Sequence, residues 1–254
     1  MKVVSLNIWG GLAGKEKLLA FFRKHEDVDI FCLQEVWSAP HALPPDTMVG
    51  GKRFGDLDLM TDSMQKISES LPDHNPFFRP QYRDNFGLMM LVKKDLEIIT
   101  EGEFFVHKEK GYGGQGDIGL HARNVQFVNV VTKNGNRSVL NFHGLWNGKG
   151  KGDSDERLIQ SDKIIQFTKT LPDPLVLCGD FNLLPETESL KKLGDSGLRD
   201  LIKEYGITST RTSFYTKPEK FADYAFASPK IKVHDFKVLP DEVSDHSALY
   251  LEFE

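Results

Sequence analysis

Residues that can bind a metal ion or move a proton stand at the ends of apolar, strand-like runs at six points of the chain. These residues are Asn7, Glu35, His143, Asp180 with Asn182, Asp223, and Asp245 with His246. Carboxylate and amide oxygens without a cluster of thiols suit Mg²⁺ or Mn²⁺ better than zinc. The two histidines add groups that can donate hydrogen bonds to a phosphate. The residue types therefore predict metal-assisted hydrolysis of a phosphoester.

Each of these residues also has a simpler interpretation. Asp and Asn favour turns, so Asn7, Asn182 and Asp223 taken singly are explained as turn residues. The turn interpretation is weaker for Glu35, because glutamate has no turn preference and here follows the buried-type run Ile30–Leu33. Six such strand ends in one chain favour a functional site over a set of turns.

Other catalytic motifs are not supported. The segment Gly10–Glu16 follows a strand-like run and opens a helix, as a nucleotide-binding phosphate loop does, but Glu16 stands where that loop needs Ser or Thr. The sequence contains no serine-hydrolase elbow (G-x-S-x-G), no zinc-protease motif (H-E-x-x-H) and no C-x-x-C pair.

A large set of strands must position these residues. Apolar runs predict ten strands, at Lys2–Ile8, Asp29–Gln34, Gly87–Val92, Glu97–Val106, Arg123–Thr132, Arg137–His143, Leu175–Cys178, Ala222–Ala227, Lys232–Leu239 and Ser247–Phe253. Helical periodicity predicts helices at Lys15–His25, Asp155–Leu171, Glu186–Leu193 and Leu198–Tyr205. We expect Asp153 and Glu156 to cap the start of the second helix. No linker or repeat divides the chain, so residues 1–254 are predicted to form one α/β domain of two stacked sheets covered by helices.

Composition narrows the class of protein further. The chain has 254 residues, 39% of them hydrophobic, and its 32 Lys and Arg against 37 Asp and Glu give a formal net charge of −5. This net negative charge argues against non-specific binding along a nucleic-acid duplex, but it is compatible with a local basic groove. No apolar run approaches the roughly 20 residues of a membrane-spanning helix, no signal-peptide pattern is found at the N-terminus, and Cys32 and Cys178 are predicted to be reduced core thiols. We therefore expect a monomer located in the cytoplasm.

The ordered set of motifs resembles the endonuclease/exonuclease/phosphatase family, which includes pancreatic deoxyribonuclease, exonuclease III-type repair enzymes, bacterial sphingomyelinases and inositol phosphatases. The segments that carry the resemblance, in the family's order, are Leu33–Val36, Gly179–Asn182, Ala222–Tyr224 and Ser244–His246. The resemblance implies a four-layer α/β/β/α sandwich of two mixed sheets with the site at one edge. It also implies that Glu35 is the principal carboxylate for Mg²⁺ or Mn²⁺, with Asn7 and Asp245 nearby.

The resemblance further implies how the remaining residues act. Asp180 would orient or deprotonate the attacking water, and Asn182 would hold that water or a phosphate oxygen. His143 and His246 would contact the phosphate. Asp223 would fix the tautomer of His246 and favour its imidazolium form.

The substrate class stays open at this stage. A phosphodiester in nucleic acid is the leading prediction, and a phosphatase or a phospholipid or sphingomyelin headgroup phosphodiesterase is the alternative at the same site. Pro240–Ser244 lacks the aromatic residue of abasic-site enzymes, which argues against that activity. A catalytically inactive binding module of the same fold is a second alternative, although none of the expected catalytic positions is missing.

Two further patterns concern substrate binding. Trp9, Trp37 and Trp146 each follow a proposed site residue closely and are predicted either to pack beneath the site loops or to form an aromatic rim that stacks on the substrate. The loop with Asn147, Lys149 and Lys151 is either a solvated charge run or a contact for additional phosphates. The other histidines are predicted to be surface or structural residues: His25, His41, His74, His107, His121 and His234.

Overall fold

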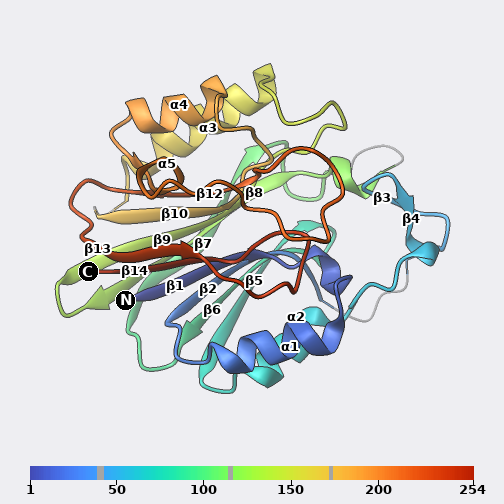
Figure 1. Cartoon of the computed structure of the whole chain (residues 1–254), viewed down its shortest axis with the longest axis horizontal. Helices are drawn as coiled ribbons and strands as arrows, with labels where there is room; N and C mark the ends of the chain where they lie inside the picture. The colour runs from blue at the N-terminus through green and yellow to red at the C-terminus, as the bar shows by residue number, and fades with distance from the viewer. Residues whose placement is uncertain (39–42, 114–116, 172–173) are drawn as a thin grey trace.

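Two β-sheets stacked face to face form the centre of the computed structural model, which describes residues 1–38, 43–113, 117–171 and 174–254. Helices α3 (Asp155–Thr168) and α4 (Glu188–Asp195) cover the outer face of one sheet, and α1 (Lys15–Lys24) and α2 (Ser63–Ser70) cover the other (Figure 1). This arrangement is the predicted four-layer α/β/β/α sandwich, so the expected fold class is confirmed. Within the described residues, no helix is both long and apolar enough to span a membrane.

Each large sheet has six strands. The first sheet has the order β13 (Val233–Val238), β14 (Leu249–Phe253), β1 (Lys2–Asn7), β2 (Ile30–Trp37), β6 (Phe86–Lys93) and β5 (His74–Tyr82). The second has the order β11 (Arg199–Asp200), β12 (Asp223–Ala227), β10 (Leu175–Asp180), β9 (Gly135–His143), β8 (Arg123–Thr132) and β7 (Ile98–His107). Among the described strands of the two large sheets, β1 with β2 and β9 with β10 are the parallel pairs, so each sheet contains one parallel pair among antiparallel neighbours.

Apolar side chains fill the space between the two sheets and beneath the helices. One core cluster joins residues of both sheets, among them Cys32 on β2 and Cys178 on β10. Both cysteines are buried free thiols, as predicted. The stripe Leu18, Phe21 and Phe22 of α1 packs into a second cluster with residues of β1 and β2, so the predicted apolar face of this helix is the one that is buried.

Several elements differ from the sequence prediction. Strand β5 is not among the predicted strands, because Pro76 and Pro80 interrupt its pattern; it tolerates them as the edge strand of its sheet. Helix α2 and the two-stranded hairpin of β3 (Met48–Val49) and β4 (Lys52–Arg53) are also missing from the prediction. The predicted helix Leu198–Tyr205 is present as the shorter α5 (Leu201–Glu204), because Arg199 and Asp200 pair in β11. Short elements such as these bury few apolar residues and leave little periodicity to read.

The predicted cap of α3 is wrong in one respect. Ser154 is the N-cap residue, and its Oγ accepts a hydrogen bond from the backbone N–H of Arg157 at 3.4 Å. The carboxylate of Asp153 instead accepts hydrogen bonds from the backbone N–H groups of Glu188 and Ser189, at 2.8 and 3.0 Å. Asp153 therefore ties the start of α4 to the loop that precedes α3.

Candidate active site

The strand topology brings the predicted residues to one edge of the sandwich. In the second sheet, Asp180 at the end of β10 pairs in register with His143 on the parallel strand β9 and with Asp223 on the antiparallel strand β12. In the first sheet, Asn7 ends β1 beside the parallel strand β2, which carries Glu35. The carboxyl ends of parallel strands lie at the same edge of a sheet, so chain segments far apart in sequence meet there.

Asp180 is the residue that links the two sheets at this edge. Its Oδ2 accepts a hydrogen bond from Nδ2 of Asn7 at 3.0 Å and lies 3.7 Å from Nε2 of both His143 and His246. Its Oδ1 accepts a hydrogen bond from the backbone N–H of Asn182 at 2.9 Å. Both carboxylate oxygens are therefore held in place by groups from four different segments.

Unusual backbone conformations set the direction of several side chains at the site. A bulge between Leu33 and Val36 interrupts the pairing of β2 with β6, and Glu35 within it has a φ of +59°. Asn182 and Trp9 also have positive φ angles, of 54° and 49°. Left-handed conformations of non-glycine residues cost free energy and tend to gather at functional sites. Three of them at one edge indicate that this backbone is shaped for side-chain placement.

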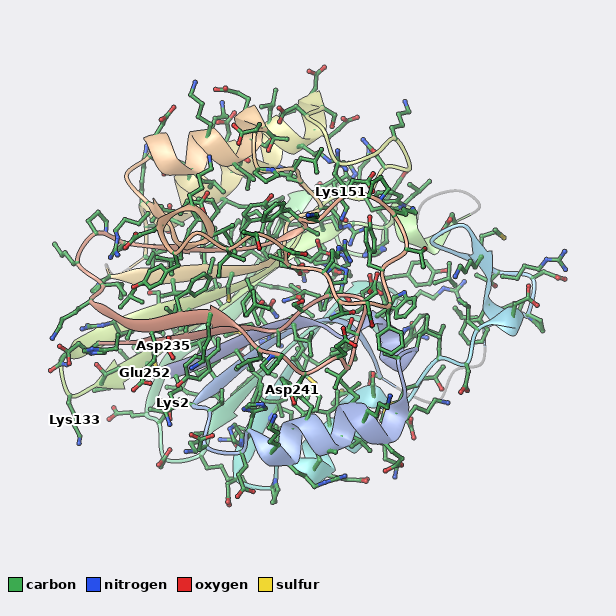
Figure 2. The ribbon with its side chains drawn as sticks, in the orientation of Figure 1. Lys2, Lys133, Lys151, Asp235, Asp241 and Glu252 are labelled. Carbon is green, nitrogen blue, oxygen red and sulfur yellow. The ribbon has the colours of Figure 1, made fainter. Side chains whose placement is uncertain are left out.

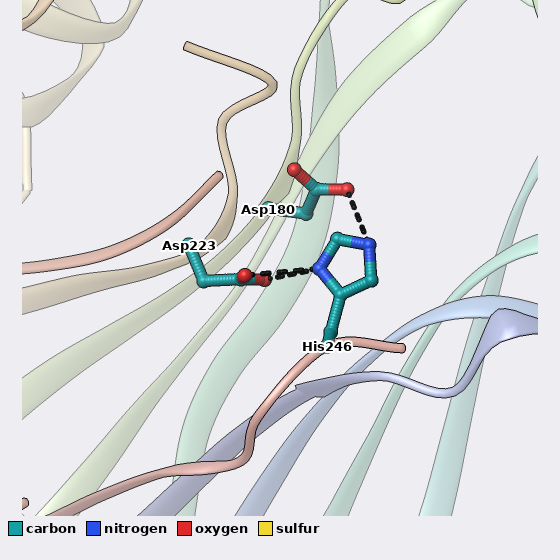
Figure 3. Close-up of side chains that lie close together, drawn as sticks. All are labelled: Asp180, Asp223 and His246. Atoms are coloured by element: carbon teal, nitrogen blue, oxygen red, sulfur yellow. Dashed lines mark hydrogen bonds and ion pairs between the residues drawn. The ribbon is translucent and has the colours of Figure 1, made fainter. Parts of the chain in front are cut away.

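His246 and Asp223 form a buried pair (Figure 3). Nδ1 of His246 lies 2.8 and 2.9 Å from the two carboxylate oxygens of Asp223, and its Nε2 faces Asp180. Burial lowers the pKa of His246 to about 4 and raises the pKa of Asp223 to about 7. Asp223 thus lies where it can accept the Nδ1 proton of His246, whereas burial opposes the imidazolium form that the resemblance implies. Burial likewise holds the pKa of His143 well below its usual value.

The carboxylates of Glu35 and Asp245 are suited to hold a cation. Burial, followed by the repulsion of Asp245 and Asp180, raises the pKa of Glu35 to about 7. Arg211 Nη1 lies 3.2 Å from Oδ2 of Asp245, while Oδ1 of Asp245 is buried without a hydrogen-bond partner. Carboxylates that repel one another and an unpaired buried oxygen both indicate that a positive charge belongs between them.

The hydrogen bonds of Asn7 and a second cluster of side chains both affect which residues could bind a metal ion. Asn7 donates from Nδ2 to Oε1 of Glu35 at 3.1 Å, and its own Oδ1 accepts from the backbone N–H of Trp9 at 2.9 Å. In this arrangement Asn7 positions Glu35. Asp180, Asp223 and His246 form a buried group, within the described part of the chain, whose ligand atoms all lie within 4.8 Å of one another and could also hold a metal ion.

The site opens into a cavity of about 220 Å³. Its polar floor includes Glu35, His143, Asp180, Asn182, Asp245 and His246. One group of lining residues is apolar or aromatic and comprises Trp9, Leu12, Trp37, Val49, Leu57, Leu59 and Phe86. Another group is basic and aromatic and comprises Trp146, Lys151, Arg211, Tyr215 and Lys217. The cavity can therefore hold both an anion and an organic group.

The predicted substrate-binding residues take different positions. All three tryptophans line the cavity, but Trp9 and Trp146 are partly exposed, whereas Trp37 is buried and packs against Phe54 and Phe86 at ring distances of 5.9 and 4.8 Å. Trp37 therefore fits the packing interpretation, while the rim interpretation stays a prediction for the other two. The residues of the predicted basic loop also take different positions. Lys151 lines the cavity, but Asn147 and Lys149 do not.

Sequence reasoning missed Arg123, which lies beside the site. Arg123, the first residue of β8, is buried, and its Nη2 donates to the carbonyl of Gly119 at 2.9 Å while Nε and Nη1 have no protein partner. Burial lowers its pKa to about 10, and the nearby Asp180 and Glu35 oppose that shift. No local motif marks Arg123 in the sequence.

The buried positions of His74 and His121 agree with the structural role predicted for the other histidines, and His121 in addition lines the cavity. His121 is buried, lies 3.2 Å from Oε1 of Gln81, and also lines the cavity with its ring 6.3 Å from that of His143. His74 is buried and bonds the carbonyl of Val28 at 2.7 Å. His41 lies outside the described residues.

Comparisons with known proteins agree with this geometry. The model of the Endonuclease/Exonuclease/phosphatase family matches residues 4–246, so the chain belongs to this family, and its membership supports hydrolysis of a phosphoester. A search of curated protein sequences gives no significant match.

Solved structures share the fold at low sequence identity. An endonuclease/exonuclease/phosphatase family protein from Bacteroides thetaiotaomicron has a TM-score of 0.74 at 18% identity, covering 100% of this chain and 97% of that chain. A mannosyl-6-phosphatase, Bt3783, from Bacteroides thetaiotaomicron VPI-5482 has a TM-score of 0.72 at 18% identity, covering 100% and 99%. D. rerio TDP2 complexed with a single-strand DNA product has a TM-score of 0.70 at 16% identity, covering 100% and 98%. The chain is thus similar in fold to proteins that differ in substrate.

Proposed function

We propose that this protein is a divalent-metal-dependent phosphoesterase that hydrolyses a phosphodiester in nucleic acid by in-line attack of a water molecule. The observation that carries the proposal is the position of Asp180, whose carboxylate lies between Asn7, His143 and His246 at the floor of a cavity. A carboxylate held by donors from both sheets, beside two imidazoles, can position a water and accept its proton.

The chain's own residues fit Mg²⁺ or Mn²⁺. Glu35 and the unpaired oxygen of Asp245 would hold the ion, with Asn7 positioning Glu35. A bound divalent cation supplies Lewis-acid polarisation of a phosphoryl oxygen and neutralises charge on the phosphate. The donor set contains only hard oxygen atoms, which is the chemistry these two ions prefer.

The remaining groups serve the phosphate and the water. Asp180 orients the water and accepts its proton, while Asn182, held by its bond to Asp180, presents its amide to the water or to a phosphate oxygen. His143 and His246 contact the other phosphate oxygens, and the buried guanidinium of Arg123 adds positive charge beside them. A phosphate dianion or diester that enters this cavity favours the protonated form of both rings, which burial alone disfavours. Charge that develops in the transition state is thereby stabilised by preorganised donors.

The lining of the cavity supports a nucleic-acid substrate. Aromatic side chains at Trp9 and Trp146 can stack on a base or sugar. The basic side chains that line the cavity beside Trp146 match a phosphate backbone; they are Lys151, Arg211 and Lys217. D. rerio TDP2, whose fold is similar, was crystallised in complex with a single-strand DNA product. A phosphatase acting on a sugar phosphate is the second candidate, because a cavity of about 220 Å³ suits a compact substrate and the similar Bt3783 is a mannosyl-6-phosphatase.

We also propose that residues 1–254 form one domain, because a single core cluster contains residues of both sheets. A monomer in the cytoplasm stays an expectation from the sequence.

A substrate panel tests the proposal. Single- and double-stranded DNA, RNA, mannose 6-phosphate, p-nitrophenyl phosphate and sphingomyelin would each be incubated with Mg²⁺, Mn²⁺ or EDTA. We expect cleavage of single-stranded nucleic acid that EDTA abolishes. Release of phosphate from mannose 6-phosphate alone would support the second candidate, and cleavage of sphingomyelin alone would place the activity on lipid headgroups. Retained nucleic-acid binding without cleavage of any substrate would instead indicate an inactive binding module.

A further inference from the structure

The short hairpin of β3 and β4 forms one side of the cavity, outside the two large sheets. Three of its residues line the cavity, Val49, Gly50 and Lys52, and we call them the hairpin wall. Figure 1 shows the hairpin at the end of the sandwich away from both chain termini. Lys151, which lines the cavity from another loop, also lies away from Lys2 (Figure 2).

The carboxylate of Asp117 holds the turn of this hairpin. The turn consists of Gly50 and Gly51, whose φ angles of +57° and +85° are those of a tight hairpin turn. Oδ1 of Asp117 accepts a hydrogen bond from the backbone N–H of Gly50 at 2.8 Å, and Oδ2 accepts one from the N–H of Gly51 at 2.7 Å. Oδ1 also accepts from the N–H of Gly119 at 2.7 Å. One side chain therefore joins the turn to the segment that precedes β8.

The segment that carries Asp117 is anchored beside the floor of the site. The carbonyl of Gly119 accepts a hydrogen bond from Nη2 of Arg123 at 2.9 Å. Arg123 is buried, and the charges of Asp180 and Glu35 act on its guanidinium. A continuous series of hydrogen bonds thus connects the turn of the hairpin to the floor of the cavity.

The strands of the hairpin are too short to fix its position by themselves. Strands β3 and β4 contain two residues each, and residues 50–53 are exposed. Val49 packs against an apolar cluster that includes Trp37 and Phe86. Because an isolated two-stranded hairpin is at best marginally stable in water, the position of the turn depends on its charge-assisted hydrogen bonds to Asp117.

The lining that continues from the hairpin wall is apolar. Leu57 and Leu59 follow the hairpin in the chain and line the cavity, and Leu59 packs against the same apolar cluster as Val49. All three side chains are partly exposed. Apolar surface that faces an open cavity is stabilised when an organic group covers it. This side of the cavity therefore suits the organic group of a phosphoester better than its phosphate.

We propose that Asp117 is a positioning residue that fixes the hairpin wall as the surface on which the organic group of a phosphoester binds. The inference rests on the proposed phosphoesterase function and specifies its substrate class: the group esterified to the phosphate has a flat aromatic face, as an aryl group or a nucleobase has. Because the wall is ordered before the substrate arrives, binding of this group costs little conformational entropy. Loss of the Asp117 carboxylate frees the turn, so the substrate then has to order the hairpin. The effect falls on KM, because the wall contacts the organic group equally before and during the reaction.

A phosphodiester with a chromogenic leaving group measures the contribution of the wall. Hydrolysis of phenyl p-nitrophenyl phosphate would be followed with Mg²⁺ or Mn²⁺. We expect Asp117→Ala to raise KM at least about tenfold while kcat stays within about twofold, since charge-assisted hydrogen bonds are among the stronger ones. Asp117→Asn keeps one oxygen acceptor and should raise KM less. Asp56→Ala removes an exposed carboxylate of the same segment, outside the cavity lining, and should leave KM unchanged.

Two further esters identify the organic group. Methyl p-nitrophenyl phosphate has the same leaving group without a second ring, and thymidine 5′-(p-nitrophenyl phosphate) carries a nucleoside in its place. A rise of KM in Asp117→Ala for the phenyl ester but not for the methyl ester supports a wall that contacts the group retained on the phosphate. An equal rise for both supports a wall that contacts the leaving group. A larger rise for the thymidine ester than for the phenyl ester assigns the wall to a nucleobase, and the reverse assigns it to a simple aryl group.

Three outcomes overturn the inference and leave the phosphoesterase intact. The first is an unchanged KM for every ester in Asp117→Ala. The second is a fall of kcat at unchanged KM, because the hairpin then acts on the reacting phosphate. The third is an equal rise of KM in Asp56→Ala, because general loss of negative charge then explains the effect.

Proteolysis tests the role of Asp117 independently of hydrolysis. Trypsin can cleave after Lys52 and Arg53 when the hairpin leaves its position, and mass spectrometry identifies these cuts. We expect them at least about fivefold faster in Asp117→Ala than in the wild-type protein and Asp56→Ala, and slowed more by phenyl phosphate than by inorganic phosphate. If no ester is hydrolysed, the proposed function fails and this assay decides. Equal cleavage of the wild-type protein and Asp117→Ala, or equal protection by the two ligands, overturns the inference.

Discussion

If Glu35 holds the metal ion, as proposed, we predict that binding depends strongly on pH. Burial, with the nearby Asp245 and Asp180, raises the pKa of its carboxyl group to about 7. Only the ionised carboxylate binds a cation, so protons compete with the metal below that pH. At pH 5.5, about 1.5 units below this pKa, the apparent dissociation constant should be about 30-fold larger than at pH 8.

Isothermal titration calorimetry with Mn²⁺ measures both the affinity and the protons released. At pH 6 most Glu35 is protonated, and binding should release close to one proton for each ion, seen as a heat that varies with the ionisation enthalpy of the buffer. At pH 8 Glu35 is already ionised and the release should be small.

A pair of variants assigns this proton to a residue. Glu35→Gln should weaken binding and remove most of its pH dependence between pH 5.5 and 8. Asp223, whose pKa burial also raises to about 7, belongs to the alternative group with Asp180 and His246. Asp223→Asn should leave the pH dependence of binding in place. If Asp223→Asn abolishes the dependence and Glu35→Gln does not, the ion is held by the alternative group and our reasoning on Glu35 is refuted.

Three further predictions follow from the packing and hydrogen bonds. Gly179→Ala should reduce the free energy of unfolding by about 3 kcal/mol or more in urea denaturation, because φ is +145° and a Cβ would lie 1.9 Å from the carbonyl oxygen of Phe142; an unchanged midpoint would contradict the close approach. Asp223→Asn should lower kcat by at least about a hundredfold with little change in KM, since the tautomer and position of His246 are lost; a change confined to KM would show that the pair acts in binding. Trp37→Ala should cost about 3–5 kcal/mol of stability, whereas Trp9→Ala should mainly raise KM; equal thermal unfolding of the two variants would contradict the different roles.

The sequence is informative where a local pattern ends abruptly. Asp180 and Asn182 follow a buried run after a single glycine, and Glu35 follows another such run, so these strand ends could be singled out from the sequence. Their meeting at one edge of the sandwich was implied by the family resemblance. The left-handed backbone at Glu35 could not, because the bulge in β2 depends on its pairing with β6. Tertiary pairing, rather than local propensity, sets that angle.

The basic residues show where prediction from sequence stops. Lys151 and Lys149 stand in the same loop and are chemically alike, yet only Lys151 lines the cavity, because its Nζ reaches the carbonyl of Phe221 some 70 residues away. No local motif marks Arg123 or Arg211 in the sequence. They are recognised only in the structure, where both side chains have buried nitrogens without a hydrogen-bond partner. Strand β5 was missed for the opposite reason, since its prolines conceal an edge strand that tertiary pairing retains.

Hydrolysis of bis-p-nitrophenyl phosphate tests the central claim most directly. The wild-type protein, Asp180→Asn and Glu35→Gln would be assayed with Mg²⁺, Mn²⁺ or EDTA. Asp235→Asn is the matched control, because this carboxylate lies on β13 and pairs with Lys237 far from the cavity lining. We predict hydrolysis by the wild-type protein and by Asp235→Asn that EDTA abolishes, and its loss in Asp180→Asn and Glu35→Gln. Hydrolysis that persists in EDTA, or that survives in Asp180→Asn, would contradict a metal-dependent phosphoesterase built around Asp180.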